Sequence, residues 1–91
     1  MTNSAIWAQN PAVITRTIDG LAVIMDPREG KVLSLNPVGT LIWEMADGKN
    51  SREEILAAVC SEFDVSSELA SSDLAEFVET LAGKNLLLAE E

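Results

Sequence analysis

Short apolar runs separated by turn residues occupy the first third of the chain and predict a three-stranded antiparallel meander. The runs are residues 12–18, 21–25 and 31–35, rich in Val, Ile and Leu. Asp19-Gly20 joins the first two, and this dipeptide tolerates the positive φ angles of a two-residue hairpin turn. Residues 26–30 contain Pro and Gly, which are typical of a second turn.

A helical period replaces the strand pattern after Asn36. Asn is a favoured N-cap and Pro37 a favoured first helical residue. The apolar positions then follow the i, i+3, i+4, i+7 rule of one buried stripe: Val38, Leu41, Ile42 and Met45. Trp43 lies outside this stripe and is expected to cover a sheet edge or a neighbouring helix. Asp47-Gly48 is expected to end the helix, since Gly is preferred where the chain turns left-handed.

Two further helices are predicted. Ser51 and Glu54 have the spacing of a capping box, so the second helix begins there. Residues 64–66 interrupt it, and a third helix, capped by a Ser at position 66 or 67, runs to about Gly83. Residues 86–88 are apolar and form either a strand stub or packed coil.

The order of these elements, three strands and then three helices, predicts an α+β fold. We expect one domain over residues 12–91, preceded by an N-terminal arm over residues 1–11. The arm is polar and unpatterned apart from Ile6 and Trp7. It is either loose or pinned to the body by Trp7.

The charge of the chain restricts its partners. A formal net charge of −9 with no His, and six basic residues scattered along the sequence, disfavours nucleic acid and anionic membranes. A basic peptide or a basic protein surface is compatible with this charge. The acidity equally serves solubility.

Chemistry-bearing residues are few, and the chain is not expected to be an enzyme. Without His, general acid–base work near neutral pH lacks its usual residue. Cys60, the one cysteine, lies on an apolar helical stripe and is expected to be an inert core thiol. No metal site and no cofactor are expected. A lone Cys, no apolar run of about 20 residues and no secretion signal lead us to expect a cytoplasmic protein.

Several of these local signals together resemble the PqqD-like family of RiPP recognition elements, small winged-helix-like domains that hold the leader of ribosomally made precursor peptides. The resemblance covers about residues 12–88. It is carried by Leu35-Asn36-Pro37, Leu41-Ile42-Trp43, Asp47-Gly48, Ser51-x-x-Glu54-Ile55, Phe63-Asp64-Val65, Asp73, Phe77, Leu81 and Asn85-Leu86-Leu87. Two positions depart from the family: Asn85 stands where Gly is common, and Leu33 lies near a usual aromatic.

The resemblance implies that a leader peptide pairs as an extra strand with the third strand and also rests on the third helix. The expected peptide-binding residues are Lys31, Val32, Leu33, Ser34 and Leu35 on the strand, and Ala75, Val78, Glu79 and Ala82 on the helix. Glu76 and Glu79 are expected at the rim, where they meet basic residues of the leader. The strand has no Pro and one charge, so little protects its edge from pairing. Alternatively, residues 1–11 or a second copy cover this edge, and the helical residues are an ordinary solvated face.

The resemblance also implies partners: the precursor peptide and a modifying enzyme, often a radical-SAM maturase. The protein itself is expected to be a monomer or a homodimer. Two other functions remain open from the sequence. A winged-helix DNA-binding regulator is one, although the third helix offers only Lys84 to neutralise phosphates. An oligomeric adaptor that self-associates through the open edge is the other.

Overall fold

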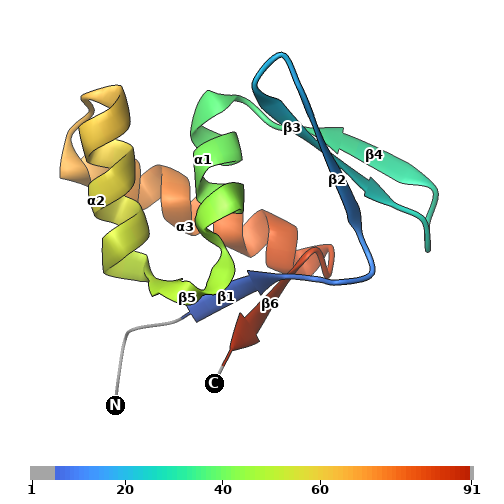
Figure 1. Cartoon of the computed structure of the whole chain (residues 1–91). Coiled ribbons are helices and arrows are strands. Elements are labelled where there is room, and N and C mark those ends of the chain that lie inside the picture. Colours follow the sequence, from blue (N-terminus) through green and yellow to red (C-terminus); the bar gives the residue numbers. More distant parts are fainter. Residues whose placement is uncertain (1–5, 91) are drawn as a thin grey trace.

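The computed structural model describes residues 6–90 and contains two three-stranded antiparallel sheets and three helices (Figure 1). The strand orders are β5-β1-β6 and β2-β3-β4. The elements are β1 (Ile6–Gln9), β2 (Ile14–Ile18), β3 (Leu21–Asp26), β4 (Lys31–Ser34), α1 (Pro37–Met45), β5 (Asp47–Ser51), α2 (Arg52–Phe63), α3 (Ser67–Gly83) and β6 (Leu87–Glu90). The predicted α+β class is confirmed.

The sheet β2-β3-β4 is the predicted meander. Its first strand begins at Ile14, two residues later than expected. Asp19 and Gly20 have φ angles of 54° and 80°. Both central residues of the hairpin therefore have positive φ, as a type I′ turn requires.

The sheet β5-β1-β6 was not expected from the sequence. Residues 6–9 lie between β5 and β6 and pair antiparallel with both, with Ile6 opposite Ser51 and Gln9 opposite Leu87. Residues 1–5 of the expected arm lie outside the described residues. Gly48 has a positive φ of 82° just after α1, but the chain continues as β5 instead of turning directly into α2. Of the two alternatives for residues 86–88, the strand is observed.

All three predicted helix starts are confirmed by side-chain caps. Asn36 Oδ1 accepts a hydrogen bond of 2.7 Å from the amide of Gly39. Ser51 and Glu54 form the reciprocal capping box, with bonds of 2.7 and 3.1 Å. Ser66 caps α3 by accepting from the amide of Leu69. Each bond satisfies a backbone amide that the first helical turn leaves without a partner.

Helix α1 contributes to two hydrophobic clusters. Ile42 packs in one cluster with residues of α2 and α3, among them Ile55 and Leu74. Trp43, fully buried, packs in the other cluster with Ile24 of β3 and Leu81 of α3. The stripe predicted for α1 therefore faces only one of its two cores, and Trp43 faces the second.

Polar bonds of Trp43 connect α1 to both sheets. Its indole Nε1 donates to Thr15 Oγ1 at 3.0 Å, and its carbonyl oxygen accepts from Gln9 Nε2 at 2.8 Å. Thr15 lies in β2 and Gln9 in β1. Since buried polar groups without partners are destabilising, these two bonds allow the residue to be buried completely.

We expect Trp43→Ala to lower the free energy of unfolding by about 3–5 kcal/mol, because it removes the largest fully buried side chain and leaves a cavity. Trp7→Ala, at a half-buried position beside the same cluster, should lower the free energy of unfolding by clearly less. Urea unfolding followed by circular dichroism measures both. Equal decreases in the free energy of unfolding would show that Trp43 contributes no more to the core than Trp7 does.

Candidate functional site

The outer edge of β4 is open along the part of the chain that the structure describes. β4 pairs only with β3, and β1 lies in the other sheet. Residues 6–9 therefore do not cover this edge, contrary to one of the alternatives drawn from the sequence.

The register shows which backbone groups the open edge offers. The amide of Leu35 donates to the carbonyl of Ala22 at 2.9 Å, and Leu33 lies opposite Ile24 in the same register. Because antiparallel bonding alternates with period two, the amide and carbonyl groups of Leu33 point towards β3. Those of Val32 and Ser34 point away from the sheet and are available to an incoming strand.

Side chains alternate along β4 as well. Val32 is on the outer face of the sheet, 61% exposed, whereas Leu33 faces inwards and is half buried. Leu35, just after the strand, is buried. The inward side chains of this segment thus reach the space between the sheet and α3.

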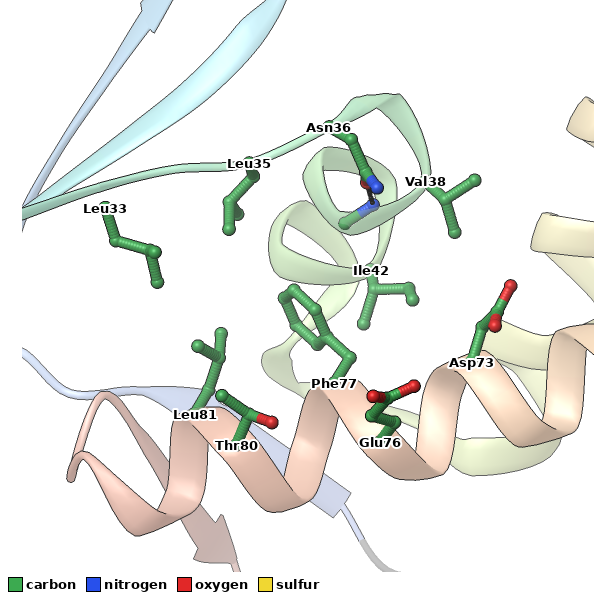
Figure 2. A pocket seen from close by; sticks show the side chains of 11 residues that line it. Leu33, Leu35, Asn36, Val38, Ile42, Asp73, Glu76, Phe77, Thr80 and Leu81 are labelled. Atoms are coloured by element: carbon green, nitrogen blue, oxygen red, sulfur yellow. Dashed lines mark hydrogen bonds between the residues drawn. The ribbon is translucent and has the colours of Figure 1, made fainter.

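A groove of about 370 Å³ lies between the end of β4, the start of α1 and one side of α3 (Figure 2). Apolar side chains form most of its lining, and Asn36 and polar side chains of α3 line the remainder. The apolar members include Leu33, Leu35, Ile42, Phe77 and Leu81, and the polar ones Asp73, Glu76 and Thr80. A channel of this shape, next to an open strand edge, suits an extended polypeptide.

Gly39 sets the position of the aromatic ring in this groove. A Cβ atom at Gly39 would lie 3.1 Å from Cε1 of Phe77 and 3.1 Å from Oδ1 of Asn36, tighter than ordinary contacts. The missing side chain therefore lets the ring of Phe77 lie against the first turn of α1. A Gly inside a helical pattern was the available sequence signal of this close approach.

A second hollow of about 250 Å³ adjoins the groove at Leu33, which lines both. It lies between the β3–β4 turn and the C-terminal end of α3, and Lys31 and Lys84 line it. At its rim, Arg28 bonds to both carboxylate oxygens of Asp26 at 2.9 Å. These hydrogen bonds from Arg28 hold the pKa of Asp26 below its ordinary value.

Four of the residues expected to bind a peptide lie elsewhere. Ala75, Val78, Glu79 and Ala82 line a separate groove of about 360 Å³, together with Trp7 of β1 and Arg52 of α2. Because successive helical residues are rotated by about 100°, this row lies on a different face of α3 from Thr80 and on the opposite side from Phe77. The structure thus places Leu33 and Leu35 at the groove beside α1, and the expected α3 residues at a different groove. Lys31 and Val32 line the second hollow, and Ser34 lines none of these.

Four residues of α3 lie beside β4: Asp73, Glu76, Phe77 and Thr80. Glu76 was expected at the rim of a peptide site, and the other three were not expected to bind a peptide. A helical pattern shows which positions share a face, but it does not say which face meets the sheet. Within residues 6–90, no group of three His, Cys, Asp or Glu is placed to hold a metal ion, and no helix is long and apolar enough to cross a membrane.

Comparison with solved structures gives two relatives that match nearly their whole length. "TbiB1 in Complex with the TbiA(beta) Leader Peptide" is 31% identical, with a TM-score of 0.82, and the match covers 92% of this chain and 98% of that one. "Lasso peptide synthetase B1 complexed with the leader peptide" is 24% identical, with a TM-score of 0.81 and coverages of 91% and 98%, and shows the shared fold alone.

A search of curated protein sequences finds no significant match. The family described as Coenzyme PQQ synthesis protein D (PqqD) matches residues 22–87. This range extends from β3 to the start of β6 and includes the open strand and the whole of α3. Since the match covers most of the chain, the protein belongs to the PqqD family.

Proposed function

We propose that this protein binds the leader segment of a ribosomally made precursor peptide and presents it to a modifying enzyme. The observation that supports this most directly is the open edge of β4 beside the groove that Phe77 and Thr80 line. The relative TbiB1, which holds a leader peptide in its solved structure, supports the same function.

Backbone pairing with β4 forms the first part of the proposed complex. An extended leader exchanges hydrogen bonds with the outward amide and carbonyl groups of Val32 and Ser34 and becomes a fourth strand of the meander. Each such bond contributes a net of about 0.5–1.5 kcal/mol. These bonds make no demand on the side chains of the leader, so they supply affinity with little selectivity.

Apolar anchors form the second part. Every other side chain of the paired leader points into the groove, because side chains alternate along a strand. Burying one Leu- or Phe-sized anchor against Leu33 and Phe77 contributes about 1.5–3 kcal/mol. Two anchors therefore contribute about as much as the backbone bonds and, unlike those bonds, determine which leader is accepted.

The protein is proposed to act by binding, with the chemistry performed by its partner enzyme. A radical-SAM maturase is the enzyme type that the family resemblance implies. We place the protein in the cytoplasm because Cys60, its one cysteine, is a free thiol. A monomer is favoured over a homodimer, since a net charge of −9 repels identical copies.

Val32→Pro should weaken leader binding at least about tenfold, because it removes an outward amide of β4 without removing a bond to β3. Thr17→Pro is the matched control, since the register places its amide on the outer edge of β2, at the other side of the sheet. Titration of the ¹⁵N-labelled protein with the precursor peptide encoded beside its gene measures both. If folded Val32→Pro binds as tightly as the parent, strand addition at β4 is excluded.

Thr80→Trp should weaken leader binding at least about tenfold, or about 1.4 kcal/mol, because the indole fills the groove beside β4. Ala75→Trp places the same side chain on the opposite side of α3, in the groove lined by Val78 and Ala82. It should leave the affinity unchanged. The reverse result would assign the leader to the α3 residues expected from the sequence.

A further inference from the structure

Three of the six basic residues of this acidic chain gather around the second hollow, which adjoins the groove at Leu33. Lys31 and Lys84 line the second hollow, and Arg28 reaches the same place, its Nη2 lying 3.3 Å from the carbonyl oxygen of Asn85. Residues 28 and 84 are far apart in sequence, so the fold brings them together.

The other end of the groove is acidic. Asp73 and Glu76 are exposed residues of α3 that line the groove of about 370 Å³, and none of the residues lining this groove is basic. This groove lies beside Leu35, just after β4, and the second hollow lies beside Lys31, at the start of β4. The second hollow is lined by Asp26 and Glu29 as well as by the two lysines, and Arg28 adds a third positive charge beside it. The net charge therefore changes from negative to weakly positive along the direction of the strand.

The lysines of the basic end are the groups available to a ligand. Arg28 is bonded to Asp26 through two hydrogen bonds, so its charge is largely compensated. Lys31 lies 3.7 Å from Glu29, with 75% of its side chain exposed, and exposed pairs of this kind contribute little. Lys84 is exposed at the end of α3. A peptide carboxylate can therefore approach both lysines without breaking a strong pair.

The direction of an added strand follows from the sheet. Both pairs in the meander are antiparallel, and parallel pairing is slightly less stable per residue. A peptide antiparallel to β4 has its N-terminal part beside Asp73 and Glu76 and its C-terminal part beside Lys31 and Lys84.

We propose that the groove selects its peptide by the order of its charges: basic residues before the apolar segment that pairs with β4, and acidic residues after it. This inference rests on the function proposed above and adds a feature of the ligand to it. A single exposed ion pair changes an affinity by only about two- to fivefold, so several contacts together predict a preference of about tenfold. Salt should reduce it, since the Debye length falls to about 3 Å at 1 M.

Two synthetic peptides of identical composition test the charge order. Both have a central segment of about eight alternating Leu and Ser residues and blocked termini. One has two Lys before this segment and two Glu after it, and the other has the two charged pairs exchanged. Titration of the ¹⁵N-labelled protein at low and high salt gives both affinities and the amides that shift.

The basic-first peptide should bind about tenfold more tightly at low salt, with shifts along β4 and α3, and the preference should shrink at high salt. The double variant Lys31→Glu/Lys84→Glu should lose the preference. Arg16→Glu/Lys49→Glu changes the net charge equally at exposed positions of β2 and β5 and should retain it.

Three results would overturn the proposal. Equal binding of both peptides at β4 would exclude selection by charge order and leave leader binding intact. A preference for the acidic-first peptide would exclude the antiparallel direction. No shift with either peptide would also overturn it, and the proposed function itself would fail only if the encoded precursor peptide likewise left the amides of β4 unshifted.

Discussion

The complete burial of Trp43 is the constraint on which the rest of the structure depends. Its ring closes the cluster beneath β3, while the adjacent Ile42 closes the cluster between the helices. The indole N–H and the main-chain carbonyl find partners in β2 and β1, so no polar group of this residue is buried without a bond. Helix α1 is thus held by both sheets, and its first turn lines the groove between β4 and α3.

The open edge of β4 is normally a hazard, because unpaired strand edges promote association between copies. Exposed apolar side chains such as Ile18 and Val32 on the outer face of the same sheet add to it. Two properties of this chain counter self-association: β4 has only four residues, and the net charge of −9 repels a second copy. A strand edge that is open to a foreign peptide but unfavourable for pairing with a second copy of this chain is consistent with a binding function.

Much of the fold follows from signals that act over a few residues. The hairpin at Asp19-Gly20 and the caps at Asn36, Ser51 and Ser66 depend on turn geometry and on side chains bonding amides three positions away. The second sheet was missed for the opposite reason. The partners of β1 lie about forty and eighty residues further along the chain, and β5 has a sequence, Asp-Gly-Lys-Asn-Ser, with little preference for strand.

About half of the candidate site could be predicted from the sequence, and the other half depends on contacts between distant segments. The sequence by itself determined that residues 31–35 form a strand, that a long helix follows later, and that both match a peptide-binding family. Only the tertiary structure decided that the Phe77 and Thr80 side of α3 faces this strand, that Ala75 and Ala82 face away, and that Arg28, Lys31 and Lys84 meet. Periodicity orders residues around a helix, but the rotation of that helix is set by packing Leu74 and Leu81 into cores that distant segments build.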